Sequence, residues 1–163
     1  MIALEHHYTS DHTWQMNFQQ EDEEVQIAFR EIRLPRSVQV SYPHEPQILA
    51  DSWAARDGLL VAAMDSETVG YISLDHDNYL QATRVTDLVV ARRLRRQKIG
   101  STLVMAAQEW AVYHESRRII LELQPKNFPA IQMARKLGFE LCGYHDYYFS
   151  NHDIAIFFSK WLR

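Results

Sequence analysis

Short apolar runs separated by polar turn residues in the middle of the chain predict a meander of three antiparallel strands. Leu59–Met64 and Val69–Leu74 flank the turn at residues 65–67, and Val85–Val90 follows a polar link. Side chains on a strand alternate between the two faces of its sheet, and turn-forming residues separate one strand from the next. These three segments are therefore expected to form the centre of a sheet.

The period of the pattern changes after the third of these strands. Apolar positions recur at helical spacing between Ile99 and Ala111, which predicts an amphipathic helix over residues 100–114 with that face inward. The next segment, Arg118–Leu123, is β-branched and apolar, as expected for a buried strand. A strand, a helix and a second strand in this order indicate a βαβ crossover.

A second helix and two closing strands complete the pattern. Ala130–Leu137 lies between Pro129 and Gly138, which matches the preference for proline at helix starts and glycine after helix ends. Phe139–Tyr144 and Ile154–Trp161 follow as strands. The order β-β-β-α-β-α-β-β predicts an α/β (α+β) fold, in which flanking helices cover a mixed, mostly antiparallel sheet.

The first third of the chain has a weaker pattern. Trp14–Gln20 alternates like a strand, the acidic residues 21–24 resemble a solvated turn, and Ile27–Leu34 is a second candidate strand. Prolines bracket an extended passage after it, and Gln47–Arg56 is expected to form a short helix that ends at Asp57-Gly58.

The composition is that of one folded domain. The 163 residues are 47% hydrophobic and 23% charged, so a single domain over residues 1–163 is expected. No stretch approaches the roughly 20 apolar residues of a membrane helix. The first ten residues also lack the basic and then apolar order of a signal peptide. We therefore expect a cytoplasmic protein without a membrane partner.

Charge and cysteine content argue against several function classes. The formal net charge of −4 disfavours general binding to nucleic acid. The one cysteine, Cys142, excludes an intrachain disulfide framework and a multi-cysteine zinc site, and it is expected to be an inert core residue. The N-terminal histidines lack the i, i+4 spacing of a helical metal site, so no metal is expected.

The segment from Leu88 to Leu103 has the features of an anion site, since a strand, a basic loop, a glycine and a helix follow one another. A helix N-terminus presents unpaired N–H groups and about half a positive charge, so a phosphate group binds there favourably. Gly100 would let the backbone approach the anion. Five of the seven residues from Arg92 to Lys98 are basic. Alone, this run would also fit a solvated loop or a nucleic-acid patch.

Two local motifs resemble those of the GNAT superfamily of N-acetyltransferases. Residues 95–100, RRQKIG, resemble the R/Q-x-x-G-x-G/A motif that binds acetyl-CoA, with Lys98 in place of the first glycine. Residues 121–130, LELQPKNFPA, and the later Gly138-Phe139 resemble a second family segment. The residues of these segments are most similar to those of the streptothricin acetyltransferase and ribosomal-protein acetyltransferase branches.

The resemblance implies acetyl-CoA (coenzyme A) as co-substrate, without a metal. The pantetheine arm would lie along the last residues of the strand, and the pyrophosphate would lie at the loop and helix start. The residues implied in cofactor binding are Leu88, Val89, Val90, Arg95, Arg96, Gln97, Lys98, Ile99, Gly100, Ser101, Thr102 and Asn127. Arg92 and Arg93 are further candidates for contacts with the outer phosphates.

The resemblance also implies direct attack of an acceptor amine on the thioester. Glu122 aligns with the general base of the ribosomal-protein branch, and Asp87 is a second candidate; an ion pair with an arginine is the alternative role of Glu122. Ala134 occupies the position of the usual general acid, a tyrosine. The substitutes are downstream tyrosines, with Tyr147 as the nominated catalytic residue: Tyr144, Tyr147 and Tyr148.

The expected function is N-acetylation of a primary amine on a small molecule or a peptide. Ala134 motivates an alternative, a non-catalytic sensor that binds acyl-CoA, and the run from Arg92 to Lys98 motivates another, a nucleic-acid-binding module. Exposed C-terminal strands could also pair two copies into a homodimer.

Overall fold

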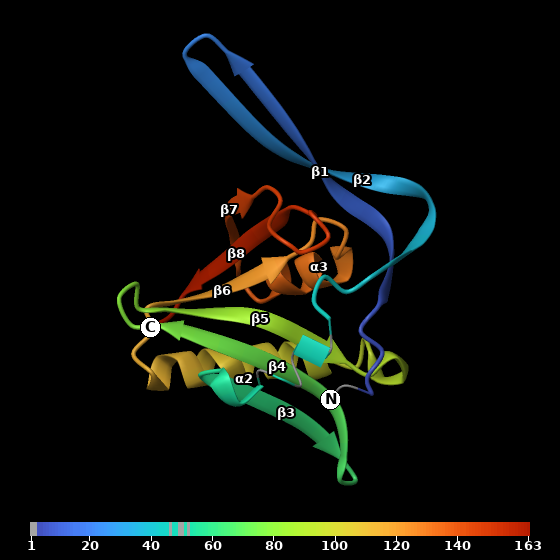
Figure 1. Ribbon diagram of the computed structural model, residues 1–163, viewed down its shortest axis with the longest axis vertical. Helices are drawn as coiled ribbons and strands as arrows, with labels where there is room; N and C mark the ends of the chain where they lie inside the picture. The colour runs from blue at the N-terminus through green and yellow to red at the C-terminus, as the bar shows by residue number, and fades with distance from the viewer. Residues whose placement is uncertain (1–2, 46, 49–50, 52) are drawn as a thin grey trace.

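A six-stranded sheet forms the centre of the computed structural model, which describes residues 3–45, 47–48, 51 and 53–163 (Figure 1). The strand order is β3-β4-β5-β6-β8-β7, and only β5 and β6 pair in parallel. The mixed, mostly antiparallel sheet predicted from the sequence is therefore confirmed. The strands are β3 (Gly58–Met64), β4 (Glu67–Asp77), β5 (Ala82–Val90), β6 (Arg118–Leu123), β7 (Glu140–His145) and β8 (Ala155–Trp161).

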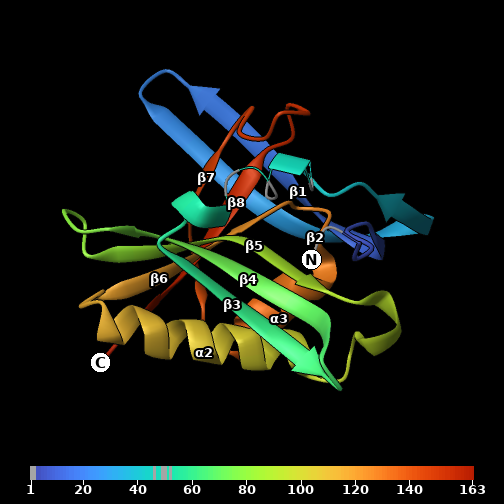
Figure 2. The same ribbon diagram turned by 60° about the horizontal axis from the view of Figure 1, so that its bottom comes forward.

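Two helices cover one face of this sheet (Figure 2). They are α2 (Ile99–Tyr113) and α3 (Phe128–Lys136), each close to its predicted range. The second helix begins two residues earlier than expected because the Asn127 side chain accepts a hydrogen bond from the Ala130 amide, as N-cap residues do. The helices and the sheet enclose the main core, which contains Ile72, Leu74, Val85, Leu103, Val104, Ala107, Ile119, Leu121, Ile131, Ala134, Phe139, Ile156 and Phe158.

The opposite face of the sheet has a smaller apolar cluster. Tyr71 and Val89 are buried there, and Leu4, Tyr42 and Leu59 pack against them. The chain on either side of the N-terminal strands therefore lies over the centre of the sheet. This arrangement brings residues before position 45 close to β5.

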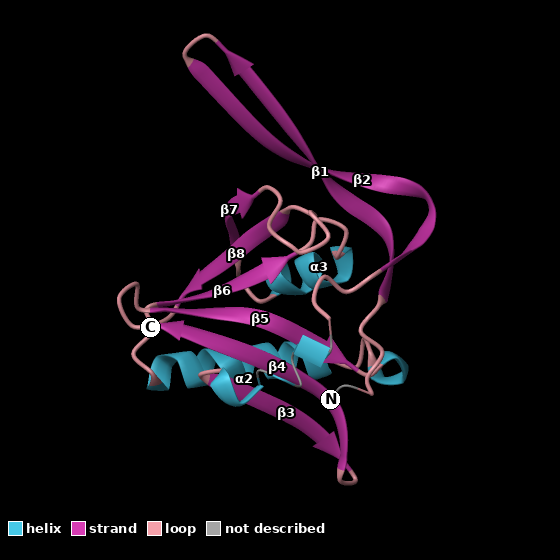
Figure 3. Ribbon diagram, in the orientation of Figure 1, coloured by secondary structure: helices cyan, strands magenta, loops and turns pink. Residues whose placement is uncertain are grey.

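The N-terminal strands form a separate two-stranded sheet (Figure 3). Both predicted strands are confirmed but are longer than expected, as β1 (Tyr8–Glu21) and β2 (Glu24–Val40). A register shift between Ser10 and His12 leaves Pro35 outside the paired positions, so its missing N–H breaks no ladder bond.

The predicted helix Gln47–Arg56 lies partly outside the described residues. Within the described part, Trp53–Ala55 is a short 3-10 turn, η1. A second such turn, η2 (Arg92–Leu94), follows β5. None of the helices in the described ranges combines the length and the apolar character needed to cross a bilayer.

Candidate active site

A β-bulge in β5 opens the sheet. Val85 pairs with Leu74 and Asp87 with Ser73, so Thr86 is an extra residue in the ladder. Pairing between β5 and β6 also stops at Val85 and Leu121. A bulge bends its strand, so the last residues of β5 diverge from β6 and leave a gap between the two strands.

The bulge also reverses the alternation of side chains along β5. Val85 lies in the main core under the helices, and Leu88 and Val90 pack against that core. Val89 belongs to the cluster on the opposite face. Asp87 therefore points to the opposite face, where it meets the N-terminal segment, rather than into the helix layer.

The N-terminus of α2 lies beside this gap. Thr102 donates the first backbone hydrogen bond of the helix, to the Lys98 carbonyl at 2.9 Å, so the amides of residues 99–101 precede the helical ladder. No side chain caps this end. Lys98 itself has φ 67°, a left-handed conformation that glycine adopts more easily. The loop thus keeps the backbone geometry expected of the motif although a lysine replaces its glycine.

A pocket of about 460 Å³ runs from the gap to this helix end. Of the twelve residues implied in cofactor binding, Gln97, Ile99 and Thr102 are not among the lining residues of this pocket. The other nine line it: Leu88, Val89, Val90, Arg95, Arg96, Lys98, Gly100, Ser101 and Asn127. Gly100 leaves open space, since a Cβ there would lie 3.5 Å from Met133 Sδ and 3.7 Å from Val90 Cγ2. An anionic ligand with a narrow arm fits this combination of free amides, basic side chains and open backbone.

The arginines of the basic loop differ in their surroundings. Arg95 donates to three backbone carbonyls, those of Val90 at 2.9 Å, His7 at 2.8 Å and Glu5 at 2.6 Å. It therefore fastens the N-terminal segment to the end of β5. Arg96 is exposed and lines the pocket.

The two arginines at the start of the loop have acidic neighbours. Arg93 pairs with Glu67 at 2.6 Å, and Arg92 lies 3.7 Å from Glu5. Part of the basic run thus serves internal contacts. This reduces the positive surface that a nucleic-acid module would need.

A smaller slot of about 50 Å³ continues the gap between β5 and β6. It shares Tyr42, Leu88, Asn127, Ala130 and Met133 with the larger pocket, and Glu122 and Asp87 are also among its lining residues. The two candidate carboxylates therefore lie where the large pocket narrows.

Glu122 is a buried carboxylate, and its side chain is only 3% exposed. Its Oε2 accepts a 2.8 Å hydrogen bond from the Tyr148 hydroxyl. Its Oε1 lies 3.3 Å from Arg84 Nη1 but accepts no hydrogen bond from the described residues. Burial raises the pKa of Glu122, although the Tyr148 hydrogen bond and the Arg84 charge oppose the shift. The ion pair considered from the sequence is present at Oε1, and this oxygen can still accept a hydrogen bond.

The structure does not bring Tyr147, the nominated acid, to Glu122. Tyr147 has φ 50° and is 71% exposed, and its ring lies against His152. The neighbouring Tyr148 makes the contact instead, and burial together with Glu122 raises its pKa to about 12. Ala134 is fully buried in the core.

Asp87 is held by several donors. The Tyr42 hydroxyl at 2.8 Å and His44 Nδ1 at 3.0 Å contact Oδ1, and Thr86 donates to Oδ2 at 3.2 Å. Burial favours a higher pKa for Asp87, but these hydrogen bonds and the His44 charge outweigh it and lower the pKa. Such a carboxylate is a poor proton acceptor, which favours a positioning role over that of a base.

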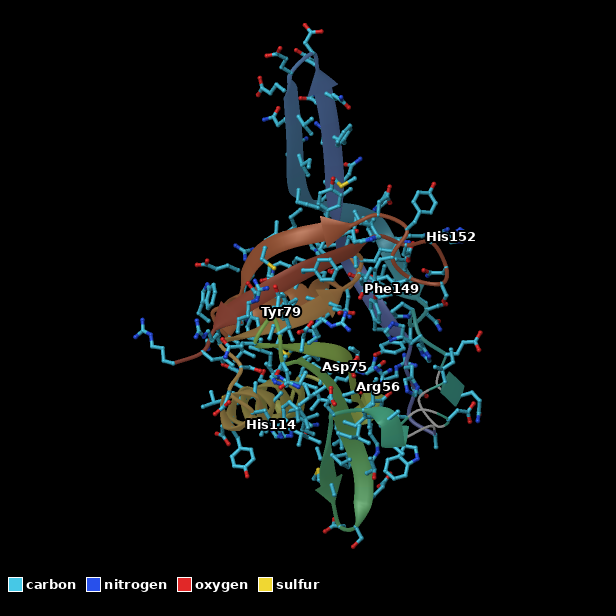
Figure 4. All side chains as sticks on the ribbon, turned by 60° about the vertical axis from the view of Figure 1, so that its left-hand side comes forward. Arg56, Asp75, Tyr79, His114, Phe149 and His152 are labelled. Carbon is cyan, nitrogen blue, oxygen red and sulfur yellow. The ribbon has the colours of Figure 1, made fainter. Side chains whose placement is uncertain are left out.

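A row of charged side chains joins the two carboxylates. Arg84 lies 3.7 Å from Asp75, and Asp75 accepts a hydrogen bond from Arg56 at 3.0 Å. Arg56 in turn lies 4.0 Å from Asp87. Figure 4 shows Arg56 and Asp75 next to each other, near the loop that carries Phe149. Charges therefore alternate from Glu122 across the open face of the sheet to Asp87.

Sequence reasoning missed several residues of this site. Tyr42 lines both cavities, yet it lies in a proline-bracketed passage 45 residues from its partner Asp87. Tyr8 lines the large pocket and donates to Gln124 at 2.8 Å. No local pattern marks either residue, since each is brought to the site only by the way the N-terminal segment folds over the sheet.

Cys142 was expected in the core but is exposed, on β7 at the edge of the sheet. Among the described residues, no group of three or more His, Cys, Asp or Glu could hold a metal ion.

Comparison with known proteins relates this geometry to a family. The sequence profile of the Acetyltransferase (GNAT) family matches residues 12–139. A protein of Bacillus subtilis (strain 168), provisionally named a [ribosomal protein bS18]-alanine N-acetyltransferase, is 23% identical over 143 residues, which are 81% of this chain and 93% of that protein. The streptothricin acetyltransferase of Streptomyces lavendulae is 29% identical over 79 residues, 48% of this chain and 42% of that protein.

Solved structures share the fold. The crystal structure of nourseothricin acetyltransferase has a TM-score of 0.83 at 22% identity, over 99% of this chain and 90% of that chain. A Bacillus anthracis str. Ames protein, provisionally titled a streptothricin acetyltransferase and solved with acetyl coenzyme A, has a TM-score of 0.72 at 17% identity, over 99% and 89% of the two chains. Because the family profile covers most of its length, this chain belongs to the Acetyltransferase (GNAT) family and is an acetyl-CoA-dependent N-acetyltransferase.

Proposed function

We propose that the large pocket holds acetyl-CoA and that Glu122 accepts a proton from the acceptor amine in the adjoining slot. The observation that carries this proposal is Oε1 of Glu122, which is buried beside the cavity, has the Arg84 charge at 3.3 Å and accepts no hydrogen bond from the described residues. A buried acceptor that lacks a hydrogen bond is costly, so an ammonium group or a water molecule is its natural donor. The raised pKa of Glu122 suits a base that works near neutral pH.

The walls of the pocket support the cofactor part of the proposal. Bound acetyl-CoA would supply the thioester carbonyl that the amine attacks. The amides at the start of α2 and the exposed guanidinium of Arg96 would bind its phosphates, while Leu88 and Val89 would line the arm. The Asn127 side chain caps α3 and faces the same cavity, so it would hold that helix against the ligand.

The tyrosines near the slot would divide two tasks. Tyr148 donates to Glu122 and would orient its carboxylate. Tyr42 lines both cavities, and burial raises its pKa well above 10, so it keeps its proton at neutral pH. We assign Tyr42, held by Asp87, as the donor to the departing thiolate in place of Tyr147.

The acceptor class is a primary amine on a small molecule or a peptide. The relatives named above act, by their names, on streptothricin and on the alanine of a ribosomal protein. Both kinds of amine therefore belong in the test. Acetyl-CoA turnover is followed by free-thiol release with a streptothricin-type amine, simple polyamines and a peptide that begins with alanine.

The expected result is thiol release with at least one amine and its loss in Glu122→Gln. Acetyl-CoA binding without thiol release for any amine would instead indicate the sensor function. Gly100→Val tests the pocket separately, because Gly100 lines it and a Cβ there would make only ordinary contacts with Met133 and Val90. Gly143→Val is the matched control, since a Cβ there lies 4.0 Å from Phe157. Equal acetyl-CoA affinity in both variants would contradict the proposed pocket.

A further inference from the structure

The distal half of the β1–β2 hairpin extends beyond the rest of the fold. In Figures 1 and 4 it projects past β7 and β8. All residues from Asn17 to Ala28 are exposed. An isolated two-stranded hairpin is at best marginally stable in water, so this projection calls for a packing partner.

One face of the projecting ribbon is apolar. Directly paired residues share a face, and the pairs Met16–Phe29, Phe18–Ile27 and Gln20–Val25 alternate with polar pairs such as Gln19–Gln26. Phe18, Ile27 and Val25 are 51%, 40% and 54% exposed. At its inner end the same face continues through Trp14 and Phe29, which pack against the main core. The core therefore extends as an uncovered apolar row into solvent.

The two ends of the ribbon have opposite charges. The turn holds four consecutive acidic residues, Glu21 to Glu24, whereas the part of β2 nearer the body holds Arg30, Arg33 and Arg36, with Glu31 among them. No ion pair within the described residues involves any of the seven turn acids and arginines. The ribbon is thus complementary to a reversed copy of itself.

We propose that this ribbon is a dimerisation arm whose apolar face packs on the same face of a second copy, in reversed direction. A two-fold axis near the Phe18–Ile27 pair would direct the acidic turn of one copy toward the part of β2 in the other copy that carries the arginines. The parallel arrangement would instead bring two acidic turns together, which like-charge repulsion disfavours. The charges select the reversed arrangement, and the apolar row provides the contact.

Sedimentation and light scattering of the full chain test the proposal. We expect a species of about twice 19.2 kDa that dissociates on dilution. The double variant Phe18→Ser, Ile27→Thr should be monomeric, whereas the matched change on the polar face, Asn17→Ser with Ala28→Ser, should stay dimeric. Circular dichroism and acetyl-CoA binding show whether each variant has kept its fold.

Crosslinking tests the orientation. In a Cys142→Ser background, Ile27→Cys should oxidise to a covalent dimer because residue 27 would lie near its own copy across the axis. Gln26→Cys, on the opposite face, should crosslink far more slowly. A wild-type chain that stays monomeric at high concentration, or equal crosslinking at positions 26 and 27, would overturn the proposal.

Discussion

The hydroxyl of Tyr148 donates a 2.8 Å hydrogen bond to Oε2 of Glu122, which joins the loop between β7 and β8 to the middle strand of the open sheet. Oε1 lies 3.3 Å from Arg84 Nη1 but accepts no hydrogen bond from the described residues, so it is the oxygen of Glu122 that can accept one from an acceptor amine. One oxygen of the carboxylate is thus held by Tyr148, and the other can accept a proton from the amine.

Glu122→Gln should lower kcat by about 10²- to 10⁴-fold, the usual contribution of a general base. The amide keeps the shape of the side chain and can still accept from Tyr148, so acetyl-CoA affinity should be unchanged. Thiol-release kinetics and calorimetry measure the two quantities. Glu140→Gln, an exposed carboxylate on β7, is the control and should leave both unchanged.

Tyr148→Phe should move the acidic limb of the pH–rate profile upward. The Tyr148 hydrogen bond favours the ionised form of Glu122 and so lowers its pKa against the larger effect of burial. Without that bond, the pKa of Glu122 rises further and the base becomes active only at higher pH. Tyr147→Phe is the matched control, because that ring is exposed. If the acidic limb of the pH–rate profile is unchanged in Tyr148→Phe, Tyr148 does not influence the catalytic carboxylate.

Stability should depend on the protonation of Glu122. Folding raises the pKa of this carboxyl above the ordinary 4.5, so the folded chain binds the proton more tightly than the unfolded chain does. The resulting stabilisation is complete below 4.5 and is lost as pH rises through the folded pKa. Glu122→Gln should therefore gain free energy of unfolding relative to wild type as pH rises from 4 to 8, and urea titrations at several pH values measure the difference.

Lys98→Gly should stabilise the chain by about 1 kcal/mol, because a side chain at φ 67° crowds its own backbone. For a domain of this size that corresponds to a rise in Tm of roughly 2–4 °C. Acetyl-CoA should still bind if the backbone amides provide the contact. Lys98→Ala removes the charge but keeps the strain, so a loss of affinity in both variants would instead assign the contact to the lysine side chain.

Arg95→Met and Arg96→Met should separate structure from binding. Arg95→Met removes three hydrogen bonds to backbone carbonyls and should lower the free energy of unfolding by about 1–3 kcal/mol. Arg96→Met should leave Tm unchanged and weaken acetyl-CoA binding by roughly three- to tenfold, the effect of one partly exposed charge. Differential scanning calorimetry and ligand titration compare the two. If Arg95→Met weakened acetyl-CoA binding and Arg96→Met lowered Tm, Arg95 would be the binding residue and Arg96 the structural one.

Local periodicity was sufficient to predict most of the sheet and both long helices. Arg118–Leu123 has the predicted bounds, since a short β-branched run between two helices has few alternatives. The bulge at Thr86 could not be predicted, because a strict two-residue period places Asp87 and Val85 on the same face. The length of the hairpin was underestimated because its outer half is polar on one side and has no body to pack on.

The catalytic part of the site was less predictable for a similar reason. Tyr147 and Tyr148 are adjacent in the sequence, and only the left-handed turn at Tyr147 decides which ring faces Glu122. Tyr42 and His44 reach Asp87 across more than 40 residues of chain. Contacts of this range depend on how the N-terminal segment crosses the sheet, which no local pattern encodes.

Because Thr86 is an extra residue in β5, the gap beside this strand depends on the number of its residues and not only on their side chains. Deleting Thr86 would leave Asp87 on the face opposite Val85 but would straighten the strand and let β5 pair further along β6. The large pocket would then close although all its wall residues were still present. Variant libraries built on this scaffold should therefore keep the number of residues between Val85 and Val90 unchanged.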